Sequence, residues 1–86
     1  MTRPLKIINP LGLHARPAAL FVKTASKYEA EITVEKDGNT VSGKSIMGLM
    51  TLQGNVGSVL KVRAEGPDAE QALEALGTLV ANKFYE

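Results

Sequence analysis

The segment from residue 31 to residue 42 constrains the fold more than any other part of the chain. Residues 31–35 alternate strictly between polar and apolar side chains, which is the pattern of a strand with one buried face. Asp37-Gly38 follows, and this dipeptide is a strong signal for a two-residue hairpin turn. The sequence therefore predicts a second strand over residues 39–42, antiparallel to the first.

Apolar spacing and loop signals divide the rest of the chain into further short elements, each with one apolar face. The full set is a strand over 2–8, a helix over 17–28, strands over 31–35 and 39–42, a helix over 46–52, a strand over 59–64, and a helix that opens at 66–68 and stays periodic to Val80. This β-α-β-β-α-β-α order predicts an α+β fold, with three helices stacked on one face of a four-stranded antiparallel sheet.

The length of 86 residues predicts a single domain over residues 1–86. Cysteine is absent, which excludes a disulfide framework, a thiolate zinc site and thiol catalysis. One histidine and scattered carboxylates make no metal constellation, and no glycine-rich nucleotide motif occurs, so neither metal nor cofactor is expected. A net charge of +1 argues against a nucleic-acid binder, and no apolar run has membrane length. We expect a cytoplasmic monomer.

The charges are unevenly distributed along the chain. Residues 1–28 contain three lysines and two arginines but no acidic residue, and the first acid is Glu29. Residues 64–86 have the opposite balance, with five acids against Lys83 alone. A basic first third in a nearly neutral protein predicts a positive surface that faces an acidic partner or a phosphate.

The only histidine, His14, comes just before a predicted helix that has no usual N-cap residue at positions 14–16. The first N–H groups of such a helix attract anions, and Arg16 adds a guanidinium that can grip phosphate oxygens. Because neutral imidazole is a good nucleophile near pH 7, these features together predict a phosphoryl acceptor. The alternative is a surface histidine in a turn, and spacing alone does not separate the two.

Ser45 stands at the natural N-cap of the helix predicted over residues 46–52. A phosphate on Ser45 would also be tolerated there beside Lys44, although the cap alone is the simpler interpretation. The helix is apolar on every side, so part of it is expected to be exposed as a partner surface. Leu20 lies on the basic side of the first helix and is expected to join that surface.

Two segments of the chain resemble the signatures of the HPr family, the histidine-containing phosphocarriers of the phosphoenolpyruvate-dependent sugar phosphotransferase system. They are residues 11–19, Leu-Gly-Leu-His-Ala-Arg-Pro-Ala-Ala, and residues 44–50, Lys-Ser-Ile-Met-Gly-Leu-Met. The resemblance extends over the whole chain in length and element order, and it implies an open-faced β-sandwich. It also implies a phosphoryl carrier rather than an independent enzyme.

The resemblance implies that His14 is phosphorylated at Nδ1 by enzyme I and that the group passes to enzyme IIA domains. Arg16 then matches the active-site arginine, and Ser45 matches the serine that HPr kinase/phosphorylase modifies. Partner-docking positions of the family fall on Ala19, Leu20, Lys23, Lys27, Ile46, Met47 and Met50.

Several related roles fit the same motifs. Residues 44–48 favour the sugar or kinase-regulated branch of the family. The nitrogen branch shares the histidine motif, and a purely regulatory HPr is a further alternative. An interaction module that uses only the apolar helix is a hypothesis of a different class, and the retained His14 and Arg16 argue against it. Val56 and Gly43 depart from the residues that many family members have at these positions.

Overall fold

The computed structural model describes residues 1–85. The elements in chain order are β1 (Thr2–Lys6), α1 (Ala15–Ala25), β2 (Glu31–Lys36), β3 (Asn39–Ser42), α2 (Ile46–Thr51), β4 (Val59–Glu65), α3 (Ala69–Ala81) and a short 3-10 turn, η1 (Lys83–Tyr85). The predicted order of strands and helices is therefore confirmed, and η1 is the one element that the sequence did not predict.

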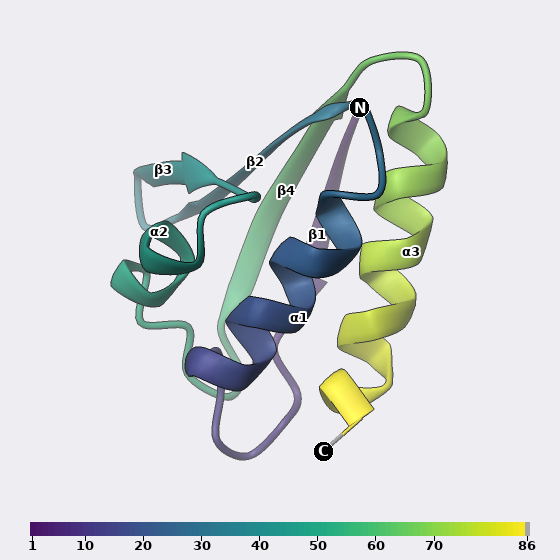
Figure 1. The fold of residues 1–86 in the computed structure, drawn as a ribbon. Helices are drawn as coiled ribbons and strands as arrows, with labels where there is room; N and C mark the ends of the chain where they lie inside the picture. The colour runs from purple at the N-terminus through teal and green to yellow at the C-terminus, as the bar shows by residue number, and fades with distance from the viewer. Residues whose placement is uncertain (86) are drawn as a thin grey trace.

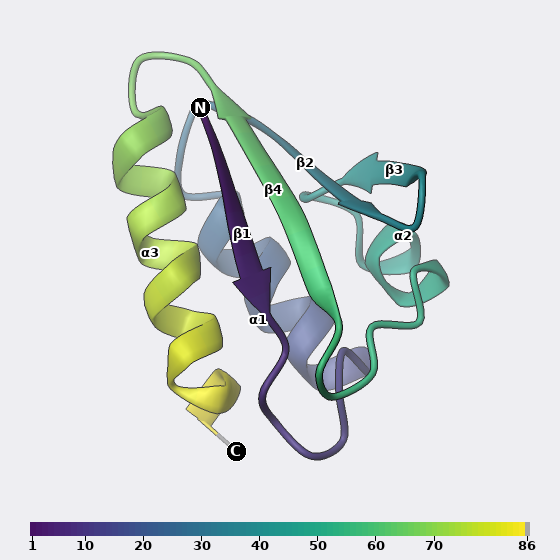
Figure 2. The ribbon, with the colours of Figure 1, turned by 180° about the vertical axis from the view of Figure 1, so that it is seen from behind.

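The four strands form one antiparallel sheet in the order β1-β4-β2-β3. Figures 1 and 2 show the three helices on one face of this sheet, with the other face open. The hairpin between β2 and β3 turns at Asp37 and Gly38, where φ is 51° and 82°. Two successive positive φ values are what a tight hairpin turn of the predicted kind requires.

Helix α1 begins two residues before the predicted start and ends three residues before the predicted end. The carbonyl of His14 accepts a hydrogen bond from the Ala18 N–H at 3.0 Å, so the first helical turn already contains Pro17. At the other end, Tyr28 donates to the carbonyl of Ala25 at 3.2 Å, which is an i to i−3 bond. The last turn tightens to 3-10 geometry, and the regular helix stops although the chain keeps turning.

The core lies between the covered face of the sheet and the helices. Alternate residues of β4, namely Leu60, Val62 and Ala64, are fully buried. They meet apolar residues of the helices, such as Phe21 of α1 and Leu76 of α3. The alternation that the sequence showed in the strands thus becomes one buried face and one open polar face.

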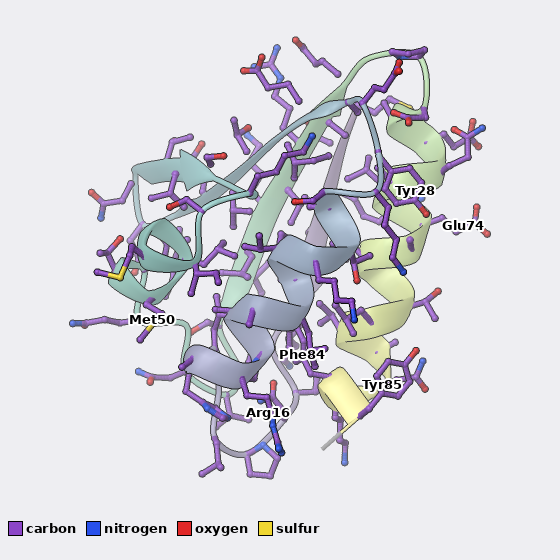
Figure 3. All side chains as sticks on the ribbon, viewed as in Figure 1. Arg16, Tyr28, Met50, Glu74, Phe84 and Tyr85 are labelled. Atoms are coloured by element: carbon purple, nitrogen blue, oxygen red, sulfur yellow. The ribbon has the colours of Figure 1, made fainter. Side chains whose placement is uncertain are left out.

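The C-terminal turn adds a core residue that the sequence pattern does not reveal. Phe84 is 1% exposed, whereas its neighbour Tyr85 is 71% exposed. Figure 3 shows the two rings turned in different directions. Lys83, Phe84 and Tyr85 all have φ between 54° and 59°, a conformation that costs energy for residues with a Cβ. Burial of the Phe84 ring offsets this cost.

Asp68 occupies the N-cap position of α3, but its carboxylate makes no capping hydrogen bond to this helix. Its two oxygens accept hydrogen bonds from the backbone N–H groups of Glu29 and Ala30, at 2.9 and 2.8 Å. These bonds lower the pKa of the Asp68 carboxyl below its usual range, with a further contribution from the charge of Lys44. Asp68 therefore ties the start of α3 to the segment that leads into β2.

Candidate functional site

His14 is the N-cap residue of α1, and this N-terminal end of α1 lies towards the lower end of the molecule in Figure 1. Its backbone is extended, with φ −85° and ψ −170°, and its side chain makes no capping hydrogen bond to the helix. The first turn of α1 contains no acidic residue. Because the N–H groups of Ala15 and Arg16 come too early in the helix to reach an intrahelical carbonyl, this end of α1 favours an anion.

The loop that holds His14 is fixed by close backbone contacts. Leu13 donates its N–H to the carbonyl of Gly54 at 2.7 Å, and the buried Asn9 donates from Nδ2 to the carbonyl of Gly12 at 2.7 Å. Gly12 has a φ of +71°, and a Cβ there would lie 2.5 Å from the Gly54 oxygen. Only glycine fits this position. The loop that carries the imidazole is thus held by these backbone contacts, and no local sequence pattern indicates that Asn9 and Gly54 take part in them.

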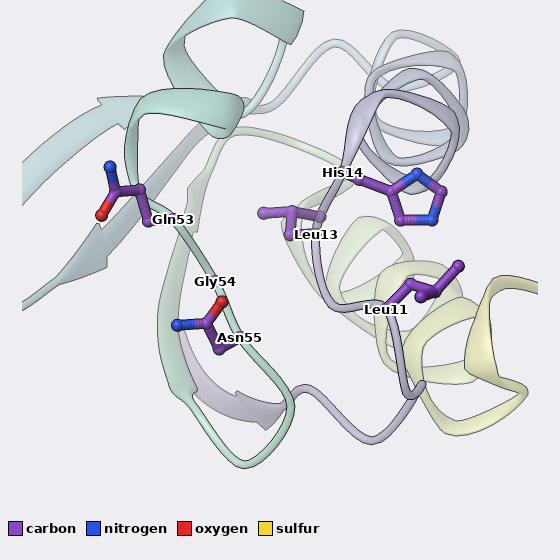
Figure 4. A pocket seen from close by; sticks show the side chains of 6 residues that line it. All are labelled: Leu11, Leu13, His14, Gln53, Gly54 and Asn55. Carbon is purple, nitrogen blue, oxygen red and sulfur yellow. The ribbon is translucent and has the colours of Figure 1, made fainter.

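A shallow hollow of about 280 Å³ opens beside His14. Its wall consists of Leu11, Leu13, His14, Gln53, Gly54 and Asn55. In Figure 4 the side chains of Leu11 and His14 project to the same side of their loop, whereas Leu13 points towards the segment 53–55. The half-buried imidazole is therefore accessible and has an apolar neighbour in Leu11.

Arg16 is exposed at the second position of α1, two residues after His14. Figure 3 shows its side chain at the lower end of the molecule. Within residues 1–85, its guanidinium takes part in no ion pair or hydrogen bond. The side chain can therefore turn towards an anion at the helix start without breaking an existing contact. An imidazole, open helix N–H groups and an exposed guanidinium are the parts that a phosphoryl acceptor needs.

Ser45 is confirmed as a structural cap, because its Oγ accepts a hydrogen bond from the Gly48 N–H at 3.0 Å. The neighbouring Lys44 extends away from α2 and donates from Nζ to the carbonyl of Tyr28 at 2.8 Å. Tyr28 follows the C-terminal end of α1, and His14 precedes its N-terminal end. The structure thus places Ser45 and His14 near opposite ends of α1, whereas Arg16 lies beside His14.

Helix α2 divides its apolar residues between the core and the solvent. Leu49 and Leu52 are buried, whereas Met47 is 74% exposed, and Ile46 and Met50 are about 40% exposed. The predicted exposure of this helix is therefore observed, and its use in docking stays a prediction. Ala19 and Lys23 of α1, and Lys27 two residues beyond its end, are also exposed.

Leu20 differs from the expectation that it is exposed. It is half-buried and packs against the core. The reason is that α1 contacts α2 and α3 as well as covering the sheet, so its buried arc is wider than a single helix face. A role for Leu20 in docking stays a prediction, with less of its surface available than the sequence suggested.

No helix formed by residues 1–85 is long and apolar enough to cross a membrane. The same part of the chain has no cluster of three or more histidine, cysteine, aspartate or glutamate residues that could hold a metal ion.

Comparisons with known proteins identify the family of the chain. A family model described as the phosphorylation site of the HPr component of the phosphotransferase system matches residues 1–82. The phosphocarrier protein HPr of Treponema pallidum is 42% identical over 86 residues, which cover 100% of this chain and 98% of that protein. An HPr-like protein Crh from Halalkalibacterium halodurans is 54% identical over 65 residues, which cover 76% of this chain and 77% of that protein.

The crystal structure of HPr from Thermoanaerobacter tengcongensis has the same fold, with a TM-score of 0.96 and 52% sequence identity. The match covers 100% of this chain and 97% of that one. Phosphocarriers hand on a group that they receive, so a protein of this kind is not an independent catalyst. The chain therefore belongs to the HPr family of phosphocarrier proteins of the phosphotransferase system.

Proposed function

We propose that the chain accepts a phosphoryl group on His14 from phospho-enzyme I and passes it to enzyme IIA domains. The observation that carries this proposal is the position of His14 at a helix N-terminus without a side-chain cap, two residues before an arginine that makes no ion pair or hydrogen bond within residues 1–85. The relay is assigned to a monomer in the cytoplasm, as the sequence leads us to expect.

In the proposed step, a ring nitrogen of neutral His14 attacks the phosphorus atom of the donor. The family resemblance assigns this role to Nδ1. A new N–P bond forms while the donor's own bond to phosphorus breaks, and the donor atom keeps that electron pair. The phosphoryl oxygens then face the N–H groups at the start of α1, and the Arg16 guanidinium can bind two of them at once. A phosphoramidate is labile, so the group can be passed on.

The direct test is incubation with enzyme I and radiolabelled phosphoenolpyruvate. We expect one label per chain, lost in acid and stable in alkali, as a phosphoramidate is. The control is His14→Ala, which should take no label. Acid-stable label, or label that survives in the His14→Ala variant, would contradict the assignment.

We also propose that Ser45 is a regulatory phosphorylation site for HPr kinase/phosphorylase. Three exposed cations, Arg16, Lys23 and Lys27, lie along α1 and the residues that follow it, and an acidic partner would be attracted to them. A phosphoserine adds about −1.5 to −2 charges to this surface and opposes that attraction. Slower association with enzyme I is the expected consequence.

The substitution Ser45→Asp tests the electrostatic part of this proposal, with Ser45→Asn as the neutral control. Both aspartate and asparagine are good N-cap residues, so the two variants differ in charge and not in the cap. We expect the aspartate variant to be phosphorylated more slowly on His14, and added salt to reduce the difference. Equal rates for the two variants at low salt would refute the charge effect.

A second candidate is a purely regulatory role, in which the chain receives a phosphate on Ser45 and passes none to sugar permeases. The similarity to an HPr-like protein Crh favours keeping this candidate. The two roles predict different results in one experiment, because a regulatory protein would be modified by the kinase but would not transfer label from enzyme I to any IIA domain.

A further inference from the structure

Asn9 is the one polar or charged residue that is buried within residues 1–85. Its side chain is 0% exposed and lies in the loop between β1 and α1, five residues before His14. Burial of an amide costs free energy unless its polar atoms form hydrogen bonds. An apolar side chain of similar size could fill the same space without this requirement. The burial of Asn9 therefore indicates a local task for the amide.

The Asn9 amide binds the backbone of Gly12. Nδ2 donates to the Gly12 carbonyl oxygen at 2.7 Å, and the N–H of Gly12 donates to the Asn9 carbonyl at 3.1 Å. The second bond closes a turn over residues 9–12, in which Asn, Pro and Gly stand at positions that β-turns favour. The turn needs only that backbone bond. The side-chain bond is therefore an additional attachment to the far side of Gly12.

This side-chain bond holds one end of the peptide group that joins Gly12 to Leu13. The carbonyl oxygen of the group belongs to Gly12 and accepts from Asn9, whereas its N–H belongs to Leu13 and donates to the Gly54 carbonyl at 2.7 Å. Figure 4 shows Leu13 directed towards the segment 53–55 at this point. Because a peptide group is planar, bonds to both of its ends fix its orientation.

His14 comes one residue after this peptide group, and helix α1 holds its other side. The His14 carbonyl accepts the Ala18 N–H at 3.0 Å, in the first turn of the helix. The backbone that carries the imidazole is thus attached before and after His14, although the ring itself lines the hollow and is accessible. Without the Asn9 amide, the peptide group before Leu13 would keep only its bond to Gly54.

The rate of phosphoryl transfer depends on where the ring nitrogen lies relative to the phosphorus atom. A displacement of about 1 Å, caused by a change away from the reacting atoms, can slow a reaction by about 100-fold. The Asn9 side chain is buried, so it cannot contact a docked protein. Loss of its amide should therefore slow the transfer step and leave the affinity for the partner unchanged.

We propose that Asn9 is a positioning residue for phosphoryl transfer, which acts on His14 through the Gly12–Leu13 peptide group. The amide forms and breaks no bond to phosphorus. The same ring position is used when the group arrives at His14 and when it leaves, so both transfer steps should depend on Asn9. This inference rests on the proposed function of His14.

The test compares wild type with Asn9→Leu, which fills the buried space with an apolar side chain of similar size and removes the donor. Asn9→Ala removes the same donor without adding bulk, and it is measured beside the leucine variant in case leucine does not fit. Single-turnover transfer from phospho-enzyme I in the saturated complex should slow about tenfold in each variant. Transfer from phosphorylated His14 to a IIA domain should slow by a similar factor, whereas the Kd for enzyme I should stay at the wild-type value.

The control for a general loss of stability is Ile32→Val. Ile32 is a buried residue of β2 and lies outside the loop that carries His14. Removal of one buried methylene should lower the melting temperature. It should leave both transfer rates unchanged, because the hydrogen bonds of the loop remain.

The outcomes separate this inference from the function on which it rests. If wild type is labelled on His14 and the Asn9 variants transfer at the wild-type rate, the positioning role is wrong. A raised Kd with an unchanged rate in the saturated complex would also overturn it, since the loop would then shape a contact surface. An equal loss of rate in Ile32→Val would assign the effect to stability. If wild type takes no label on His14, the proposed function fails and this inference fails with it.

Discussion

Replacement of Ser45 by alanine should destabilise the protein even where no phosphate is involved. The Ser45 hydroxyl is the side-chain cap of α2, because it accepts the Gly48 N–H at 3.0 Å. Loss of a serine cap costs about 1 kcal/mol, within a range of about 0.5–2 kcal/mol. For a domain of this size, about 1 kcal/mol lowers the melting temperature by about 4–8 °C. We expect a fall of that size for Ser45→Ala.

The matched control for this prediction is Ser45→Asn, which cannot be phosphorylated as serine is but retains a capping oxygen. Thermal unfolding followed by circular dichroism, with urea titration to check the slope, measures both variants against wild type. We expect asparagine to remain within about 2 °C of wild type and alanine to fall below it. The cap argument is refuted if the two variants unfold at the same temperature.

Three further predictions concern the charged and apolar residues around the site. Arg16→Lys should slow transfer of label to His14 without changing the melting temperature, because an ammonium cannot bind two phosphoryl oxygens at once; an unchanged rate would make Arg16 a simple surface charge. Met47→Glu should raise the Kd for enzyme I strongly and lower the melting temperature only slightly. A variant that unfolds more easily but binds enzyme I as wild type does would show that Met47 supports the fold and does not dock the partner. The lowered pKa of Asp68 means that its hydrogen bonds stabilise the fold above about pH 4 and are lost as the pH falls through that lowered pKa. Wild type should therefore melt above Asp68→Asn at pH 7, and this difference should disappear in acid; a difference that persists in acid would contradict the role of the carboxylate.

The sequence predicts best where a local signal and the tertiary fold agree. Asp37-Gly38 both adopt the positive φ values of a hairpin turn, and Ser45 caps α2 as its residue type suggests. In each case one or two side chains determine the local backbone, so no knowledge of the distant chain is needed. The order of elements follows from such signals together with apolar periodicity.

The sequence predicts least where a residue depends on contacts far along the chain. Leu20 looks exposed on a helical wheel, and the packing of α1 against both α2 and α3 explains why it is half-buried. Phe84 is buried in a turn in which Lys83, Phe84 and Tyr85 all have positive φ. None of the three is glycine, so no local sequence pattern predicts this turn. Asn9 reads as a loop residue, although its amide is buried and holds the backbone of Gly12.

The positions of Ser45 and His14 limit how one modification could affect the other. Helix α1 has 11 residues and is about 16 Å long at 1.5 Å per residue. His14 precedes the N-terminal end of α1, and Tyr28 follows its C-terminal end. Lys44, the residue before Ser45, donates from Nζ to the Tyr28 carbonyl. Helix α2 begins after Ser45 and ends before the segment 53–55 that lines the hollow at His14. Screening weakens the field of a phosphate on Ser45 across that separation, since the Debye length is about 8 Å at physiological salt. Between the two sites lies the exposed surface of α2, where a docked partner would meet Met47. The regulatory effect should consequently appear in the affinity and association rate of enzyme I, whereas the chemical step measured in the saturated complex should stay the same.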